Sequence, residues 1–377
     1  MQKTGVGIIG YGFIGKVHAF GWRSIPFYYD PPPLDVRLVE VATSSSSTAE
    51  AALRHGGFES ATDDWRRLIE RKDIGIIDVC TPNPLHAEQL KAAMAAGKHI
   101  YCDKPLTVTM READEVGLAM KSWQGIGGMT FQNRFFSGVQ RTRQLIDEGF
   151  LGTLVSFRAV YLHSGSIDPS APLKWKLRAS EGGGVLRDLG SHLLDMVDWL
   201  AGPMEEIRME TRILYPTRPD GAGGVQAVDA EDQVVLTVRV AGGALGTLEA
   251  SKIATGAEDD LRVELHGTRG AIRFDLMQPD FLEIYSLADP AMPLGGTRGW
   301  KRVAALSRYA APAGFPSPRA TSGWMRGHVH CQYTFLKAVA EGRQPDPSLS
   351  RGIEVQRLME CAEKSAQTGA WQKVPRG

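Results

Sequence analysis

The chain has 377 residues, and its 43 Lys and Arg residues balance 43 Asp and Glu residues. This length exceeds what one hydrophobic core usually organises, so we expect two domains, residues 1–131 and residues 132–377. The charges balance and no block of basic residues appears, so we expect no nucleic-acid-binding surface; with no run of about 18 apolar residues, we expect no membrane-spanning segment.

The first turn of the chain carries a dinucleotide-binding pattern. A short apolar run over residues 6–9 leads into glycines spaced as G-x-G-x-x-G. The first glycine suits a tight turn, the second lets the backbone approach phosphates, and the third lets the next helix pack closely. The helix N-terminus adds free N–H groups and a partial positive charge. The residues expected to hold the pyrophosphate of NAD or NADP are Gly10, Gly12, Phe13, Ile14 and Gly15.

The first 131 residues alternate between short apolar strands and helices. A loop is expected over residues 26–33, which contain three consecutive prolines. The expected strands are 1–10, 36–42, 75–81, 98–102 and 128–131, and the expected helices are 15–23, 48–55, 63–70, 84–96 and 111–122. This alternation predicts an α/β Rossmann domain with a doubly wound parallel sheet, whose ligands gather at the carboxyl ends of the strands.

Thr81, Pro82 and Asn83 follow one of these strands. Asn83 is a good N-cap and Pro84 suits the first helical position, so the segment is expected to start a helix. Because an N-cap can also face a ribose, we expect Thr81, Pro82 and Asn83 to contact the cofactor. His86 lies in the first helical turn, and two interpretations stay open for it: a surface histidine or a cofactor contact.

Asp103 and Lys104 end the next strand, at the edge where a nicotinamide would lie. The Lys104 ammonium can hold a substrate hydroxyl and help to set its ionisation, so Lys104 is a candidate catalytic residue. The alternative is a surface lysine on a turn.

The choice between NAD and NADP depends on the end of the second strand. NAD recognition usually needs an acidic residue there, but Thr43, Ser44 and Ser45 occupy the position. The next basic residue is Arg54. Because a 2′-phosphate normally draws an arginine, these residues favour NAD, with Thr43 and Ser44 as candidate contacts.

The second half is rich in strands and predicts an α+β domain with a large, mostly antiparallel open sheet. The expected strands are 153–163, 233–240, 244–253, 262–266 and 271–274. One face is expected to pack helices, and the other is a candidate subunit interface. Residues 289–322 are expected to form an irregular loop that covers the site, before helices at 327–341 and 353–367.

A glycine run and an acid–histidine pair stand between the first and later strands of this sheet. Asp188 and His192 are four residues apart, which predicts that both lie on one face of a helix. The glycines at 182–184 let the backbone pass close to a ligand or another chain. An imidazole beside a carboxylate accepts an alcohol proton well, although a pair with this spacing is often only a surface contact.

Cysteine and histidine spacing argues against a metal site. Cys80, Cys102, Cys331 and Cys361 are scattered in apolar segments, so we expect reduced thiols in a cytoplasmic protein. The residues at 328, 330 and 331 (His, His and Cys) do not share one helix face, so no metal is expected.

Together these motifs resemble the Gfo/Idh/MocA family, the glucose–fructose oxidoreductase and inositol dehydrogenase group. The residues that carry the resemblance are Gly10, Gly12, Gly15, Thr81, Pro82, Asn83, His86, residues 96–99, Asp103, Lys104, Pro105, Arg134, Trp175, residues 182–184, Asp188, His192, residues 266–270 and residues 337–342. Within the family, the spacing around residues 63–65, Tyr161 and residues 172–175 is most similar to the levoglucosan dehydrogenase branch.

The resemblance implies a dehydrogenase that oxidises a ring hydroxyl of a cyclic sugar, anhydrosugar, glycoside or inositol. Lys104 would hold the hydroxyl, His192 would take its proton, and Asp188 would orient His192 or bind a neighbouring hydroxyl. The further candidate substrate contacts are Arg134, Tyr161, His163 and Trp175, although Tyr161 and Trp175 are equally compatible with core packing. The resemblance also implies a homodimer or homotetramer associated through the second-domain sheet.

Two positions depart from the family pattern. Asp103 replaces the usual glutamate before Lys-Pro, and Asn133 replaces a frequent tyrosine before Arg134. Two other functions stay open: glycoside cleavage through transient oxidation by bound NAD, and a non-catalytic dinucleotide sensor. The sensor is disfavoured because Lys104, Asp188 and His192 are all present.

Overall fold

The computed structural model describes residues 3–375, and the chain divides into two compact units. The first comprises residues 1–135 and 307–356, and the second comprises residues 136–306 and 357–377. The expected domain boundary after residue 131 stays a prediction. It does not take into account that a later segment, residues 307–356, returns to pack with the first unit.

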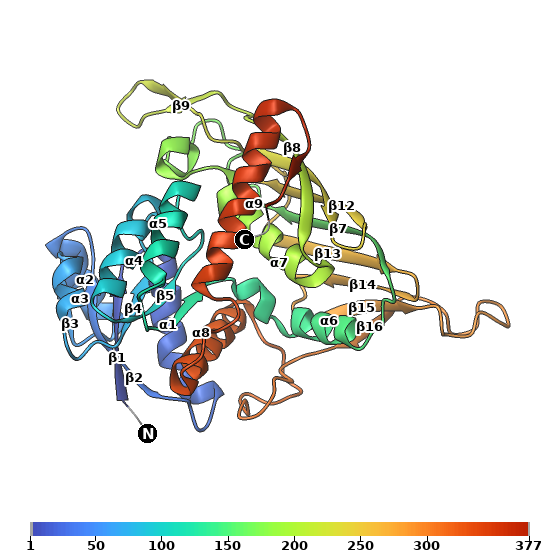
Figure 1. The fold of residues 1–377 in the computed structure, drawn as a ribbon, viewed down its shortest axis with the longest axis horizontal. Helices are drawn as coiled ribbons and strands as arrows, with labels where there is room; N and C mark the ends of the chain where they lie inside the picture. Colours follow the sequence, from blue (N-terminus) through green and yellow to red (C-terminus); the bar gives the residue numbers. More distant parts are fainter. Residues whose placement is uncertain (1–2, 376–377) are drawn as a thin grey trace. The chain divides into compact units, whose positions relative to one another are not determined.

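The first unit is built on a six-stranded parallel sheet (Figure 1), with the strand order β3-β2-β1-β4-β5-β6. The strands are β1 (Lys3–Ile9), β2 (Asp35–Ala42), β3 (Ser60–Thr62), β4 (Ile76–Val79), β5 (His99–Cys102) and β6 (Gly127–Met129). The sequence order reverses between β1 and β4, where doubly wound sheets bind their ligands. The predicted Rossmann fold is confirmed.

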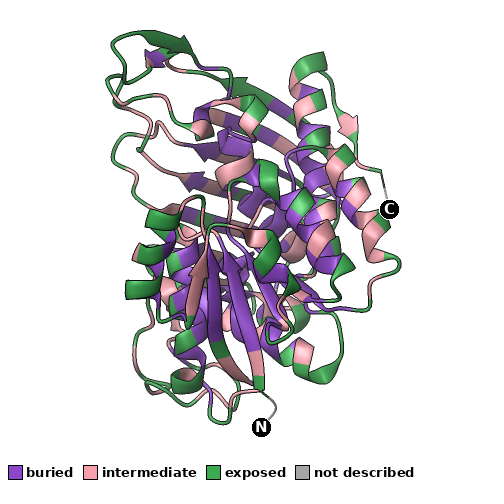
Figure 2. Ribbon diagram, turned by 90° about the vertical axis from the view of Figure 1, so that its left-hand side faces the viewer, coloured by how far each residue is buried: buried purple, intermediate pink, exposed green. Residues whose placement is uncertain are grey.

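Helices cover both faces of this sheet. They are α1 (Phe13–Tyr28), α2 (Ser46–Gly56), α3 (Trp65–Glu70), α4 (His86–Ala95), α5 (Met110–Met120) and α8 (Trp324–Glu341). Helices α3, α4 and α5 pack in a row, and α1 packs against α8 on the opposite face, as right-handed crossovers require (Figure 1). Strand β4 is buried along its whole length, and Figure 2 shows the buried strands of this sheet in purple.

The expected loop over residues 26–33 is partly wrong, because α1 continues to Tyr28 with Pro26 inside it. Trp22, Ile25 and Tyr29 are each at most 1% exposed. Their burial stabilises the extra turn and offsets the hydrogen bond that Pro26 cannot donate.

The second unit contains a nine-stranded sheet in the order β16-β15-β14-β13-β7-β12-β11-β8-β17. Its strands are β7 (Leu154–Leu162), β8 (Met204–Arg212), β11 (Gln233–Val240), β12 (Leu245–Ser251), β13 (Asp260–Gly267), β14 (Gly270–Asp275), β15 (Phe281–Ser286), β16 (Lys301–Ala304) and β17 (Gln372–Lys373). Strands β7 and β12 are parallel, and the other pairs are antiparallel, which confirms the predicted sheet. The segment 289–322 is less irregular than expected, because β16 lies within it.

Helices α6 (Ser137–Asp147) and α7 (Ser191–Ala201) contact this sheet, and β9 (Thr217–Pro219) and β10 (Val225–Ala227) form a separate hairpin. Helix α9 (Leu349–Thr368) begins in the first unit and ends in the second. Within residues 3–375, no helix combines the length and the apolar character that crossing a membrane requires.

A buried polar cluster lies under the first turn of the Rossmann unit. Asp78 accepts hydrogen bonds from Trp22 Nε1 at 2.7 Å and from His18 Nδ1 at 2.9 Å. Cys80 Sγ lies 3.1 Å from His18 Nδ1, and the His18 and Asp78 side chains are fully buried. The three potential ligand atoms of His18, Asp78 and Cys80 lie within 4.8 Å of one another. Since they are hydrogen-bonded to one another, we interpret the cluster as a structural one.

Asp78→Asn is expected to lower the free energy of unfolding by about 3 kcal/mol, because it leaves a buried ion pair without its anion. The midpoint of urea unfolding, followed by tryptophan fluorescence, measures this loss. Glu115→Gln is the control: Glu115 forms a 2.6 Å ion pair with Lys91, in which both side chains are 40% exposed. It should leave the midpoint unchanged. Equal midpoints for the two variants would contradict a stabilising role for the buried pair.

The same pair makes stability depend on pH. Burial alone would lower the pKa of His18, but the charge of Asp78 and its hydrogen bond raise it above 6.5. The stabilisation is therefore fully present below pH 6.5 and is lost as the pH rises through the higher pKa of the folded state. Asp78→Asn should remove this part of the pH dependence.

Candidate functional site

The glycine loop after β1 leaves open space only above its middle glycine. Gly10 has φ +95°, and a Cβ atom there would lie 2.5 Å from the Cys80 carbonyl oxygen. A Cβ on Gly15 would lie 2.2 Å from the Gly10 carbonyl oxygen, whereas a Cβ on Gly12 would meet nothing within 4 Å. The outer glycines thus close the turn, and Gly12 faces free space. No side chain caps the N-terminus of α1, so this loop fits a dinucleotide pyrophosphate.

Gly12→Val is expected to raise the KM for NAD about tenfold, because its side chain would enter the space that the pyrophosphate needs. Its thermal stability should stay close to that of the unchanged protein, since no atom lies where the new Cβ would be. Gly15→Ala is the matched control and should destabilise the fold, because its Cβ meets backbone. Steady-state kinetics and thermal unfolding separate the two effects. An unchanged KM in Gly12→Val would exclude this loop as the pyrophosphate site.

His86 links the segments that follow β4 and β5 through a hydrogen bond to each. Its Nε2 lies 2.9 Å from the Thr81 carbonyl oxygen, and its Nδ1 lies 2.9 Å from the Pro105 carbonyl oxygen. His86 is fully buried, so the surface-histidine interpretation is wrong. Because Lys104 immediately precedes Pro105, this imidazole fixes the backbone that carries Lys104, whose side chain is half-buried, as is that of Asp103.

The expected N-cap role of Asn83 is wrong. Asn83 is the first residue of a short 3₁₀ helix, η1 (Asn83–Leu85), and α4 begins only at His86 without a side-chain cap. The His86 side chain turns back to the Thr81 carbonyl, which stabilises this tighter turn. Asn83 is 8% exposed at the carboxyl edge of the sheet, and its contact with the cofactor stays a prediction, as do those of Thr81 and Pro82.

A carboxylate that the sequence analysis missed lies beside the end of β2. Strands β2 and β3 are parallel with Ala42 opposite Thr62, so Thr43 and Asp63 leave the sheet side by side. The Ser46 hydroxyl donates to Asp63 Oδ2 at 2.5 Å, and Asp63 is exposed. A carboxylate at this edge repels a 2′-phosphate and can accept from a ribose hydroxyl.

The segment after β6 holds a buried amide with no partner. Asn133, in the 3₁₀ helix η2 (Gln132–Phe135), is 2% exposed. Within residues 3–375, neither its Oδ1 nor its Nδ2 has a hydrogen-bond partner. Such a group is costly unless a ligand satisfies it. The neighbouring Arg134 is also 2% exposed, and its Nη1 donates to Asp346 at 2.9 Å.

In the second unit, the expected single helix face for Asp188 and His192 is wrong in detail. Residues Leu186–Gly190 form a π-helical turn, η5, and His192 lies in the first turn of α7. A spacing of four residues therefore does not place Asp188 and His192 on one face here, as it would in an α-helix. Glu231 Oε1 accepts from the Leu186 N–H at 2.9 Å and holds the start of this turn.

The glycine run before η5 is needed for close backbone packing within the unit. Gly184 has φ +105°, and a Cβ there would lie 2.5 Å from the Glu231 carboxylate. A Cβ on Gly183 would lie 2.5 Å from the Lys176 carbonyl oxygen. These glycines approach neighbouring parts of the same chain, which is a sufficient physical reason for the run.

Asp188 lies between two lysine ammonium groups. Lys176 Nζ is 3.0 Å from both Asp188 carboxylate oxygens, and Lys252 Nζ is ion-paired with Oδ2. The Asp188 and Lys252 side chains are only 20% and 14% exposed. Lys176 also lies over the ring of the half-buried Trp175, in η3 (Trp175–Leu177), 5.7 Å from its centroid. Neither lysine was among the site residues predicted from the sequence.

Tyr161, His163 and His192 are brought together at the end of β7. The Tyr161 ring contacts the His163 ring at a centroid distance of 5.1 Å and the His192 ring at 5.9 Å. Both Tyr161 and His163 bind Asp259, a carboxylate that the sequence analysis also missed. The parallel pairing of β7 with β12 brings His163 and Lys252 to the same end of the sheet.

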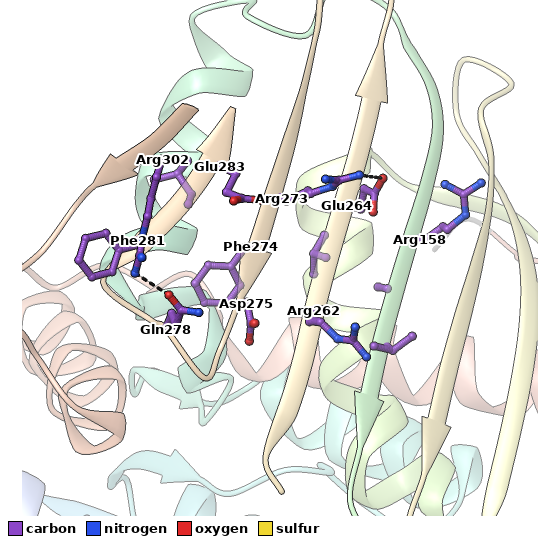
Figure 3. Close-up of a pocket in the computed structure, with 14 residues that line it drawn as sticks. Arg158, Arg262, Glu264, Arg273, Phe274, Asp275, Gln278, Phe281, Glu283 and Arg302 are labelled. Atoms are coloured by element: carbon purple, nitrogen blue, oxygen red, sulfur yellow. Dashed lines mark hydrogen bonds and ion pairs between the residues drawn. The ribbon is translucent and has the colours of Figure 1, made fainter. Parts of the chain in front are cut away.

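The sheet of the second unit has a hollow of about 550 Å³ over β7, β13, β14 and β15 (Figure 3). Charged side chains of both signs line it, including Arg158, Arg262, Arg273, Glu264 and Asp275. Arg273 donates to Glu264 at 3.2 Å, as Figure 3 shows. These residues belong to the charged, open face of the sheet.

Comparison with known proteins agrees with both units. Residues 4–128 match the model of the oxidoreductase family with an NAD-binding Rossmann fold, and residues 139–273 match the GFO/IDH/MocA C-terminal domain. The chain is 35% identical to levoglucosan dehydrogenase of Pseudarthrobacter phenanthrenivorans, over 100% of this chain and 99% of that protein. It is 27% identical to inositol 2-dehydrogenase of Rhizobium meliloti, over 95% and 96%. A solved structure of levoglucosan dehydrogenase in complex with NADH is 34% identical and superposes with a TM-score of 0.95 over 100% of both chains.

Proposed function

The chain belongs to the Gfo/Idh/MocA family of oxidoreductases, and from this premise we propose which role each site residue has in the reaction. The protein is an NAD(P)-dependent sugar dehydrogenase. We propose an anhydrosugar or a related cyclic sugar as the substrate, oxidised at a ring hydroxyl. The observation that carries this proposal is the similarity to levoglucosan dehydrogenase along the whole chain.

The cofactor supplies the nicotinamide carbon that accepts a hydride from the sugar. In our proposal, Lys104 donates a hydrogen bond to the reacting hydroxyl, and His192 accepts its proton. Asp188, with Lys176 and Lys252 beside it, binds a neighbouring hydroxyl. The other proposed substrate contacts are Arg134, Tyr161, His163 and Trp175.

Cofactor binding is assigned to the glycine loop with Gly10, Phe13, Ile14 and Gly15, to Thr43 and Ser44, and to Thr81, Pro82, Asn83, His86, Asp103 and Lys104. The open space above Gly12 supports the pyrophosphate position, and the Asp63 carboxylate beside Thr43 supports NAD over NADP. We assign these groups to a dinucleotide-binding domain of residues 1–131 and the other substrate contacts to residues 132–377.

We also propose a homodimer or homotetramer that associates through the open sheet face. The hollow there presents arginines and carboxylates, a mixture that can be complementary to itself across a two-fold axis. The molar mass in solution tests this, and a monomeric mass would contradict it. A cytoplasmic location is proposed because Cys80, Cys102, Cys331 and Cys361 are buried and form no disulfide.

A substrate screen tests the proposed activity. Anhydrosugars, cyclic sugars, glycosides and inositols are offered with NAD and NADP separately, and the absorbance of the reduced nicotinamide is followed. We expect reduced NAD to accumulate with at least one anhydrosugar, faster than reduced NADP. Activity confined to inositols would contradict the proposed substrate class.

A further inference from the structure

Asp259 joins two candidate site residues on one carboxylate oxygen. Its Oδ1 accepts a hydrogen bond from the Tyr161 hydroxyl at 2.7 Å and lies 3.0 Å from His163 Nε2. The His163 and Asp259 side chains are about one-third exposed, and Tyr161 is 4% exposed. Hydrogen bonds to a charged acceptor are stronger than those between neutral groups, and these two fix both rings.

The pairing of β7 with β13 places Asp259 beside Tyr161 and His163. In the antiparallel pair β7–β13, Leu162 lies opposite Asp260 and Tyr161 lies opposite Leu261. The residue before β13 therefore comes opposite the residue after β7, which is His163. Side chains alternate along a strand, so Tyr161 and His163 share one face, while Asp260 points to the other.

The cluster reaches His192 through the Tyr161 ring. The His192 and Tyr161 rings meet edge to face, with centroids 5.9 Å apart at 63°, and His192 is 5% exposed. Burial alone would raise the pKa of Asp259, but hydrogen bonds from His163 and Tyr161 and the charges of His163 and His192 hold it below its usual range. Asp259 thus stays ionised near His192, and the two interact electrostatically.

Asp188, another acidic residue of this unit, is in a different charge environment. Two ammonium groups, those of Lys176 and Lys252, neutralise Asp188. Asp195, one turn further along α7, is 1% exposed. Asp259 is linked to His192 through the Tyr161 ring and through its charge.

We propose that Asp259 is a positioning residue of the dehydrogenase reaction. Through Tyr161 it fixes the orientation of His192, and its negative charge stabilises the imidazolium that forms during oxidation. This inference rests on the proposed function for His192. In that step the substrate O–H bond breaks and its proton goes to His192, while the C–H bond breaks and its electron pair leaves as hydride to NAD. Asp259 itself keeps its charge throughout.

Asp259→Asn keeps the side-chain shape and removes the charge. We expect the NMR titration midpoint of His192, in the full chain without substrate, to move to lower pH by about one unit, because an imidazolium loses a nearby anion. The His192 resonance is assigned from its absence in His192→Asn. Asp260→Asn is the matched control: Asp260 lies one residue away and forms a 2.8 Å ion pair with Arg262, so the midpoint should not move.

Kinetics then separate positioning from a merely structural role. In Asp259→Asn we expect kcat to fall about tenfold with little change in KM, and the ascending limb of kcat against pH to move to lower pH with the His192 titration. Asp259→Glu should recover part of kcat. Tyr161→Phe keeps the ring and the Asp259 charge, so it should change kcat more than the His192 midpoint.

An unmoved His192 midpoint in folded Asp259→Asn would overturn the proposal. If Asp259→Asn does not fold, the same midpoint in Asp259→Glu decides: it should stay near that of the unchanged protein, and a shift as large as about one unit would also overturn the proposal. Since the titration needs no substrate, a protein that oxidises no sugar but shows the shift would contradict the proposed function alone.

Discussion

Lys104→Ala is expected to lower kcat about 100-fold or more while the affinity for NAD stays nearly unchanged. Lys104 follows β5 at the ligand-binding edge of the Rossmann sheet, and His86 fixes its backbone through Pro105. Its ammonium is the group we assign to the reacting hydroxyl, so its removal raises the barrier to chemistry more than it weakens cofactor binding. Stopped-flow kinetics with sugar, and NAD titration without sugar, measure the two effects.

Lys91→Ala is the control for this variant. Lys91 is on α4 of the same unit and forms an exposed ion pair with Glu115, so its loss should leave kcat unchanged. Equal turnover in Lys104→Ala and Lys91→Ala would remove Lys104 from the mechanism. A large loss of NAD affinity in Lys104→Ala would instead make cofactor binding, and not the reacting hydroxyl, the main role of the lysine.

His192→Asn should lower kcat by a similar factor of about 100, because it removes the acceptor for the hydroxyl proton. Asparagine keeps a polar amide at this position but loses the ring contact with Tyr161. Without the imidazole, the remaining activity should increase with pH as hydroxide takes over the role of the base. The pH dependence of kcat measures this change.

His266→Asn is the matched control. His266 is on β13, on the open face of the nine-stranded sheet, and its Nε2 lies 2.5 Å from Glu264 Oε1. It should retain full activity. If His192 and Lys104 act in one step, the double variant should lose less than the product of the two single losses. Strictly multiplicative losses would argue for two independent steps.

The fold was largely predictable because its signals are local. Apolar strands such as residues 75–81, and a glycine loop at the end of β1, indicate a Rossmann sheet without knowledge of distant contacts. Pro26 was misleading for the same reason: only the burial of Trp22 and Tyr29 explains why α1 continues past it.

The site was less predictable because it depends on strand register. Asp63 and Asp259 reach their places through the pairing of β2 with β3 and of β7 with β13, which no local pattern in the sequence reveals. Similarly, the spacing of Asp188 and His192 was interpreted with α-helical periodicity, whereas η5 is a π-helical turn. Residue types that suit the chemistry were identified, but several of their partners were not.

Hydride transfer itself is tested most directly with a substrate that is deuterated at every ring carbon. The sugar that gives the fastest reduction of NAD is used, and the reduced cofactor is analysed by mass spectrometry. Our account predicts that each molecule of reduced NAD carries one deuterium, transferred from the carbon whose hydroxyl is oxidised. Reduced NAD without deuterium, formed at the rate of sugar oxidation, would contradict it.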